Sequence, residues 1–219
     1  MPYLFPAFLD LVRSSTPGVH LDVGCGNGVK TAAFAAAGLQ AVGVDISTDA
    51  LISASQTSYV QAPRYACARG EALPFRDQSI ASISDILMCT HLDEVAWPRY
   101  FREIRRVLKD GGYVVLVLFS MADLHFHGHP VSRRYTFRYD PANPTMLGFA
   151  HYHGMVNVHF DLADIQTAFA NGFDIVEAVQ VQHPVYTERF LWNVILHKPM
   201  PSVRASSTAT HSSSTATHE

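Results

Sequence analysis

Lysine is scarce in this chain of 219 residues, since Lys30, Lys109 and Lys198 are the only ones and arginine carries most of the positive charge. The 16 basic and 19 acidic side chains give a net charge of −3, and no stretch collects basic residues into a stripe. Binding to nucleic acid depends largely on neutralising phosphates with Lys and Arg. We therefore expect no nucleic-acid partner.

Long apolar runs are also missing. The longest, Tyr113 to Phe119, has the length of a strand and is too short to cross a bilayer. The N-terminus shows no basic leader followed by a long apolar stretch, so a secretory signal is not expected. The chain has 3 cysteines, an odd number that suits reduced thiols in a reducing compartment. These absences predict a cytoplasmic protein that neither crosses nor binds a membrane.

The sequence divides into a domain at 1–199 and a tail at 200–219. The length and 48% hydrophobic content fit one globular domain with a buried core. The tail is rich in Ser, Thr, Ala and His, and the run SSTATH at Ser206–His211 recurs at Ser213–His218. It offers too little apolar area to offset its ordering entropy, so we expect disorder. The alternative, a metal-binding tail, has no supporting ligands around its two histidines.

Strand and helix patterns alternate through the domain. Strands separated by helices predict a mainly parallel sheet covered on both faces, and two final strands joined by a short link predict an antiparallel hairpin. The expected fold is a Rossmann-like, seven-stranded α/β domain. The predicted strands are 19–23, 40–44, 65–68, 80–85, 113–119, 173–182 and 189–197, and the predicted helices are 1–12, 31–37, 48–57, 94–108 and 161–170.

A glycine loop follows the first predicted strand. The segment His20 to Gly28 reads HLDVGCGNG, and about seventeen residues later the second strand ends at Asp45. Glycines let a ligand approach the backbone without a Cβ clash, and an acid at the next strand end can accept two hydrogen bonds from a ribose. Together they predict a nucleoside site, although glycines that merely form a turn are the alternative. The spacing G-x-G-x-G disfavours the dinucleotide enzymes, which use G-x-G-x-x-G.

These motifs resemble those of the class I S-adenosylmethionine-dependent methyltransferases, in particular a broad small-molecule group. The similar segments, in order, are LDVGCGNG, AVGVDIS, RGEALPF, SISDILMCTHL and IRRVLKDGGYVVLVLFS. The resemblance implies S-adenosylmethionine as cofactor, a small-molecule acceptor and no metal. It implies that glycines pass under the methionine part, that Asp45 holds the ribose and that Ile46 lies against the adenine. The implied cofactor-binding residues are Asp22, Gly24, Cys25, Gly26, Asp45, Ile46, Arg69, Gly70, Glu71 and Asp85.

Arg69 departs from the family pattern, because members usually carry an acid there that accepts the adenine amino group. Arginine cannot accept a hydrogen bond. Adenine would then be recognised by the backbone around Gly70 or by stacking on the guanidinium. This departure keeps open an alternative function, a non-catalytic or repurposed member of the fold.

Methyl transfer from a sulfonium needs a base only if the acceptor must lose a proton. Asp85 ends the fourth strand and could bind the cofactor's ammonium, orient an amine acceptor or cap the next helix. His91 matches a common family position, and the alternative is a histidine hydrogen-bonded within its loop.

The segment Ser120 to His159 lacks a regular pattern and is predicted to form the acceptor pocket and its lid. It follows the fifth strand, at the sheet edge where ligands of open α/β sheets bind. The N-terminal helix adds only a few residues that could cover the cofactor: Tyr3, Phe5, Phe8 and Leu11.

The segment from Ser120 to His159 holds half of the 12 histidines, namely His125, His127, His129, His151, His153 and His159. One imidazole, with His151 and His153 as candidates, could act as base. A metal site and uninvolved surface histidines are the alternatives. Arg133, Arg134 and Arg138 could clamp an anionic acceptor or form a solvated face.

Overall fold

The computed structural model describes residues 3–15, 17–57, 63–93, 95–123, 129–130, 136–138, 156–183 and 189–201. Helices and strands alternate along these ranges as predicted, with boundaries within a few residues of the expected ones. The elements are α1 (Phe5–Ser14), β1 (Val19–Val23), α2 (Val29–Ala36), β2 (Gln40–Asp45), α3 (Thr48–Gln56), β3 (Arg64–Cys67), β4 (Ile80–Ile86), η1 (Cys89–His91), α4 (Ala96–Val107), β5 (Leu108–Ser120), β6 (His129–Pro130), β7 (Thr136–Arg138), β8 (Val156–Phe160), α5 (Leu162–Phe169), β9 (Asp174–Gln182) and β10 (Phe190–His197).

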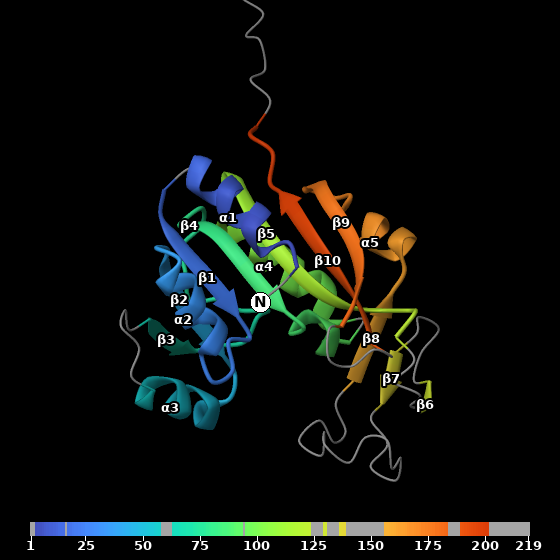
Figure 1. The fold of residues 1–219 in the computed structure, drawn as a ribbon, viewed down its shortest axis with the longest axis horizontal. Coiled ribbons are helices and arrows are strands. Elements are labelled where there is room, and N and C mark those ends of the chain that lie inside the picture. The colour runs from blue at the N-terminus through green and yellow to red at the C-terminus, as the bar shows by residue number, and fades with distance from the viewer. Residues whose placement is uncertain are drawn as a thin grey trace, which may run out of the picture.

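The seven predicted strands form one sheet, shown in Figure 1, in the order β3-β2-β1-β4-β5-β10-β9. The pairs from β3 to β5 are parallel, whereas β10 is antiparallel to both β5 and β9. The predicted mainly parallel sheet and C-terminal hairpin are therefore confirmed. Among the described residues, β6, β7 and β8 extend this sheet to ten strands, and the sequence did not predict them.

The strand β8 corrects the expectation that the irregular segment runs to His159. It lies parallel to the end of β5, where Phe119 pairs with His159 and Ser120 pairs with Phe160. Asn157 and His159 are buried in β8, whereas Val156 and Val158 are only half-buried. Polar residues thus occupy the buried positions, so the usual alternation of apolar and polar residues does not reveal this strand.

The strand expected at 113–119 is also longer than predicted. Asp110, Gly111 and Gly112, which are residue types typical of a turn, lie inside β5, which begins at Leu108. Gly111 has a positive φ of 77°, and the pairing of β4 with β5 shifts register there. Such an irregularity absorbs the turn within a continuous strand.

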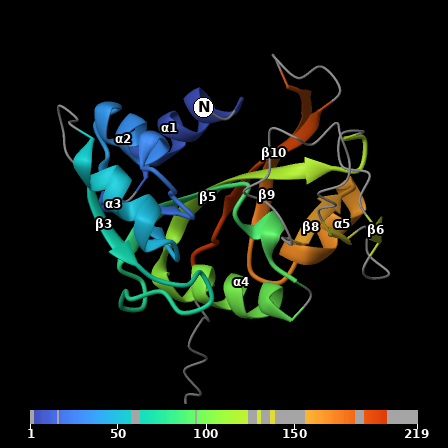
Figure 2. The ribbon, with the colours of Figure 1, turned by 90° about the horizontal axis from the view of Figure 1, so that it is seen from below.

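Helices cover both faces of the sheet, and Figure 2 shows α1 and α2 on the side opposite α4. Phe8 from α1 packs with Phe34 from α2 against Val115 and Ile195. On the other face, α4 and α5 enclose the larger part of the core. Phe5 and Phe8 both contact Phe34 edge-on, so these two residues belong to the core and do not cover a cofactor as expected.

Candidate functional site

The glycine loop joins β1 to α2 at the carboxyl edge of the sheet. Gly24, Gly26 and Gly28 all have positive φ, which favours glycine. A Cβ on Gly24 would collide with Met88, and one on Gly28 would collide with Tyr65. A Cβ on Gly26 would meet nothing within 4 Å, so this glycine borders open space. A ligand can approach the loop backbone at Gly26.

Asp45 ends β2 beside this opening. Its Oδ2 accepts a hydrogen bond from the Gly26 backbone N–H at 2.8 Å, and its Oδ1 accepts one from the Ser47 N–H at 2.9 Å. Each carboxylate oxygen keeps a further lone pair, because an ionised carboxylate has about four acceptor sites. The side chain therefore fixes the loop and can still accept two hydrogen bonds from a diol.

An apolar surface and a tight turn lie next to Asp45. Ile46 is 60% exposed, which is unusual for a large aliphatic side chain and leaves it free to contact a planar ring. The Arg69 guanidinium pairs with the Glu71 carboxylate at 3.2 Å. Gly70, between them, has Met88 and Tyr100 so close that a Cβ would lie 3.0 Å from each. The Arg69 side chain is 64% exposed, whereas Gly70 is closely packed.

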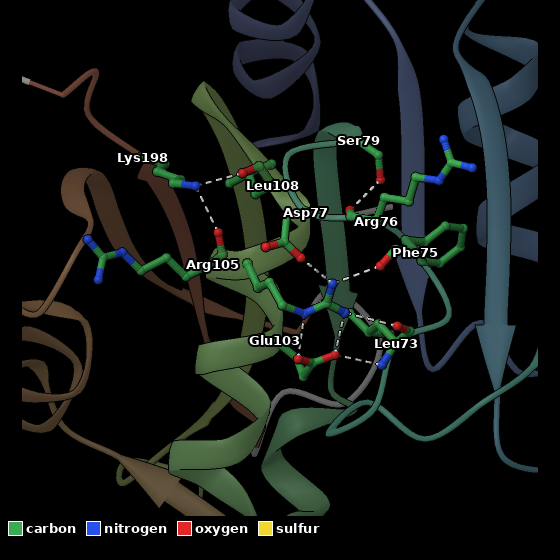
Figure 3. A network of polar contacts seen from close by, with 10 residues as sticks. Leu73, Phe75, Arg76, Asp77, Ser79, Glu103, Arg105, Leu108 and Lys198 are labelled. Atoms are coloured by element: carbon green, nitrogen blue, oxygen red, sulfur yellow. Dashed lines mark hydrogen bonds and ion pairs between the residues drawn. The ribbon is translucent and has the colours of Figure 1, made fainter.

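Arg106 anchors the segment after this turn to α4. Figure 3 shows the residues that it contacts: Leu73, Phe75, Asp77 and Glu103. Its guanidinium forms ion pairs with Glu103 at 2.7 Å and with Asp77 at 2.8 Å. It also donates to the Leu73 and Phe75 carbonyls. Glu103 in turn accepts from the Leu73 N–H, and its hydrogen bond from Arg106 lowers the pKa of the Glu103 carboxyl. These contacts therefore hold the segment that follows the Gly70 turn in place against α4.

Two predicted cofactor residues next to the loop are buried. Asp22 accepts hydrogen bonds from the Thr31 and Ser84 hydroxyls, both at 2.6 Å, and burial raises its pKa. Cys25 packs against Gly43, and burial raises the pKa of its thiol to about 12. Cys25 is therefore a neutral thiol, and all 3 cysteines of the chain are free.

Asp85 is fully enclosed at the end of β4. Its carboxylate accepts from the Met88 and Cys89 N–H groups and, at 2.6 Å, from the Tyr100 hydroxyl. Burial raises the pKa of Asp85 to about 6. Of the three roles that the sequence left open, these contacts correspond to the cap of the following helical turn.

His91 lies in that helical turn, η1, and its ring contacts β8 rather than only its own loop. Its Nδ1 lies 3.2 Å from the Val156 carbonyl of β8, and its ring meets Phe119 edge-on. Burial lowers the pKa of His91, which keeps the imidazole neutral near pH 7. The contact nevertheless places His91 beside the end of the predicted lid segment.

Most of the histidine-rich segment lies outside the described residues. This holds for His125, His127, His151, His153, Arg133 and Arg134, and for the side chains of His129 and Arg138. His159 is described, and it is buried in β8 with its ring stacked on Phe119. In the described part of the chain, no three His, Cys, Asp or Glu side chains lie close enough to hold a metal ion.

The structure also reveals a buried ion pair that the sequence did not suggest. Arg189, at the start of β10, lies 3.4 Å from the Asp123 carboxylate and 5.1 Å from the centre of the Phe119 ring. The two charged residues are 66 positions apart. No motif could have joined them, because only the pairing of β10 with β5 brings them together.

A cavity of about 690 Å³ lies between α4, α5 and β8. Aromatic side chains such as Trp97, Phe101 and Phe169 line it, and Arg102 and Arg105 lie on its α4 wall. Of the described residues in the predicted lid segment, Val158 and His159 line this cavity. The glycine loop contributes nothing to its lining, so the cavity and the opening at Gly26 are separate features.

An open α/β sheet with a glycine loop after β1 and a carboxylate at the end of β2 defines a nucleoside-binding domain of the Rossmann-like class. Residues 21–116 match the family described as "Methyltransferase domain". Residues 21–116 therefore contain a domain of this methyltransferase family, as their motifs predict.

Individual relatives agree with this assignment. The 18S rRNA (guanine-N(7))-methyltransferase bud23 of Schizosaccharomyces pombe is 29% identical over 117 residues, which are 49% of this chain and 44% of that protein. The chain thus spans less than half the length of this curated relative. A SAM-dependent methyltransferase from Methanosarcina mazei has a TM-score of 0.68 at 20% identity, over 84% of this chain and 93% of the other.

A further structure combines the same fold with ligands. It is the 1,6-didemethyltoxoflavin-N1-methyltransferase of Burkholderia thailandensis, with bound 1,6-didemethyltoxoflavin and S-adenosylhomocysteine. Its TM-score is 0.64 at 20% identity, over 90% of this chain and 78% of the other. At such identities the two solved structures show a shared fold. None of the helices in the described ranges is long and apolar enough to cross a membrane.

Proposed function

We propose that this chain transfers the methyl group of S-adenosylmethionine to a small-molecule acceptor. The observation that carries the proposal is the open approach to Gly26 beside the Asp45 carboxylate. When bound, the cofactor supplies a methyl group already activated on a sulfonium. The chain then has to align the acceptor and exclude water.

The residues divide by the part of the cofactor that they would hold. The backbone at Gly24 and Gly26 would border the methionine part, and Asp45 would accept from the ribose hydroxyls. Ile46 would pack against one face of the adenine, and the turn at Arg69, Gly70 and Glu71 would recognise its edge through backbone groups. Asp22, Cys25 and Asp85 are buried beneath this surface, and we assign them to shaping it.

The acceptor pocket and its lid would come from the segment between β5 and β8. The two parallel strands that flank this segment, β5 and β8, have their carboxyl ends side by side, where Ser120 pairs with Phe160. His91 contacts the returning strand at Val156. A neutral imidazole there, or at His151 or His153, could accept a proton from an acceptor that must lose one.

The charge of the chain favours a small acceptor. A net charge of −3 and only three lysines give little to neutralise a phosphate backbone. The Burkholderia neighbour binds a small heterocycle, which is consistent with this choice. The rRNA-modifying relative gives the second candidate, an RNA acceptor. Three free thiols are consistent with a cytoplasmic location.

The test is calorimetric titration with S-adenosylmethionine on the wild type, Gly26→Ala and Gly38→Ala. Both glycines have positive φ and open space around a Cβ, but Gly38 ends α2 away from the site. Both variants should lose similar stability, about 1 kcal/mol, from backbone strain. Only Gly26→Ala should lose affinity, by about tenfold or more, since its methyl group fills the approach.

Equal affinity in the two variants would contradict the site. Turnover is measured separately, as formation of S-adenosylhomocysteine with a library of small acceptors and with rRNA. Tight binding without turnover on any acceptor would favour the non-catalytic alternative, and turnover on rRNA alone would favour the second candidate.

A further inference from the structure

A chain of buried polar side chains crosses from β4 to β1, where β1 leads into the glycine loop. In the parallel pairing of the two strands, His20 lies opposite Ser82 and Asp22 lies opposite Ser84. All four side chains are almost completely buried. Buried polar groups cost stability unless each is hydrogen-bonded. The contacts among them therefore have to account for every donor and acceptor.

The series of hydrogen bonds that links these side chains is continuous. The Ser84 hydroxyl lies 2.6 Å from the Asp22 Oδ1, and the His20 Nε2 lies 3.1 Å from the Ser84 Oγ. The His20 Nδ1 lies 2.9 Å from the Ser82 Oγ. On the other side of the carboxylate, the Thr31 hydroxyl donates to the Asp22 Oδ2 at 2.6 Å.

The proton positions follow from the carboxylate. An ionised carboxylate only accepts, so Ser84 donates its single hydrogen to Asp22. Ser84 must then accept from the Nε2–H of His20. Burial lowers the pKa of His20 to about 3, so the ring is neutral and has one N–H. The Nδ1 of His20 consequently accepts from Ser82. In each of these hydrogen bonds the donor lies farther from Asp22 than the acceptor. This common direction strengthens the hydrogen bond from Ser84 to Asp22.

We propose that His20, acting through Ser84, holds Asp22 as a fixed negative charge next to the cofactor, so that the site favours cationic S-adenosylmethionine over its neutral product. This inference rests on the proposed function. The cofactor carries a sulfonium, an ammonium and a carboxylate, for a net charge of +1. After transfer, the sulfonium becomes a neutral thioether and the net charge is zero. His20 is a positioning residue, since it acts only through another side chain.

The surroundings of Asp22 support an electrostatic role. The Asp22 charge raises the pKa values of Cys25 in the glycine loop and of Tyr100 from α4, so its field reaches both. Lys30 from α2 favours the ionised form of Asp22, and Asp45 opposes it. Burial raises the pKa of Asp22, whereas the hydrogen bonds from Ser84 and Thr31 lower it. The two hydroxyl donors thus decide how far toward acid pH the charge persists.

The test compares dissociation constants for S-adenosylmethionine and S-adenosylhomocysteine by calorimetry between pH 5 and 8. Asp22→Asn should weaken binding of the cofactor by about tenfold more than binding of the product, since only the cofactor carries the sulfonium charge. In the wild type, affinity for the cofactor alone should fall as acid protonates Asp22. In Ser84→Ala and His20→Phe, this fall should occur at higher pH because Asp22 has lost support.

A double-mutant cycle separates this role from packing. His20→Phe keeps an aromatic ring between Phe8 and Phe34, which both contact His20. Its effect on the ratio of the two dissociation constants should vanish in an Asp22→Asn background. Ser55→Ala, on exposed α3, is the control with no expected effect.

An equal loss of affinity for both ligands in His20→Phe would overturn the inference and leave His20 a packing residue. Additive effects of His20→Phe and Asp22→Asn in the double variant would do the same. If His20→Phe does not fold, Ser82→Ala and the wild-type pH series provide the same comparison. A wild type that binds neither ligand would instead overturn the proposed function.

Discussion

The two halves of the carboxyl edge are built in different ways. Around β1, β2 and β4, the polar groups contact residues that are close in sequence or opposite in the strand register, such as Asp22 with Thr31 and with Ser84. Around β5, β8 and β10, they contact residues from distant segments, such as Asp123 with Arg189 and His91 with the Val156 carbonyl. A short motif can therefore encode the proposed cofactor half, whereas the proposed acceptor half exists only once the sheet has formed.

The largest expected effect lies in the acceptor half. Arg189→Ala removes the cation that lies 3.4 Å from the buried Asp123 carboxylate, which should lower the free energy of unfolding by about 4 kcal/mol. Arg13→Ala removes an exposed pair with Asp10 and should cost less than about 0.5 kcal/mol. Chemical denaturation measures both. If the two variants lose equal stability, the buried pair does not hold this half together.

Asp85 lies where the halves meet, and its burial makes stability depend on pH. Its folded pKa of about 6 exceeds the unfolded value of 3.8, so its protonated form stabilises the fold in acid. Between about pH 4 and 6, the wild type should lose roughly 3 kcal/mol relative to Asp85→Asn as pH rises. Denaturation of both proteins across this range gives the difference. Parallel curves would show that Asp85 has no raised pKa.

In the cofactor half, Asp45→Ala should weaken S-adenosylmethionine binding by about 100-fold, because two charge-assisted bonds to the ribose are lost. The variant also frees the Gly26 N–H that shapes the loop. Asp49→Ala, in the exposed first turn of α3, is the matched control. Unchanged affinity in Asp45→Ala would contradict the assignment of Asp45 to the ribose. It would also contradict the description of this half of the edge as the cofactor half.

The smallest effect is expected at the C-terminal end. Truncation after Pro199 should change the melting temperature by less than about 1 °C, since the removed residues offer little apolar area. Truncation after His197 also removes Lys198, whose ammonium donates to the Arg105 and Leu108 carbonyls and pairs with Asp110. That variant should lose about 2 kcal/mol. A similar loss in both would show that the tail packs against the domain.

Much of the cofactor half could be predicted because its chemistry lies in contiguous residues. The glycine loop, the position of Asp45 at a strand end and the succession of strands along the sequence follow from the spacing of glycines and the alternation of apolar segments. The role of Asp85 did not follow, since a carboxylate at a strand end can serve a ligand or a cap, and only its contacts decide. The His20 chain was also missed, because a histidine in a strand looks like an isolated polar residue until its neighbour strand is known.

The acceptor half was harder for a physical reason. In β8 the buried positions are Asn157 and His159, which reverses the pattern that identifies a strand. Arg189 stands before β10, and the buried carboxylate of Asp123 that it contacts lies 66 positions away in sequence. The predicted role of Ser120–His159 as lid stays a prediction, with its best polar candidates, His151 and His153, outside the described residues.

The pairing of Ser120 with Phe160 has a consequence for how such a protein can change. Ser120 ends β5 and Phe160 ends β8, so both ends of the excursion that contains β6, β7 and β8 are fixed side by side in the sheet. The connections between these short strands can be lengthened or exchanged without moving the seven predicted strands. Doubling the length of a closed loop costs only about 0.6 kcal/mol of chain entropy. A specificity for new acceptors could thus evolve by changes in this excursion alone, while the rest of the fold and the glycine loop stay unchanged.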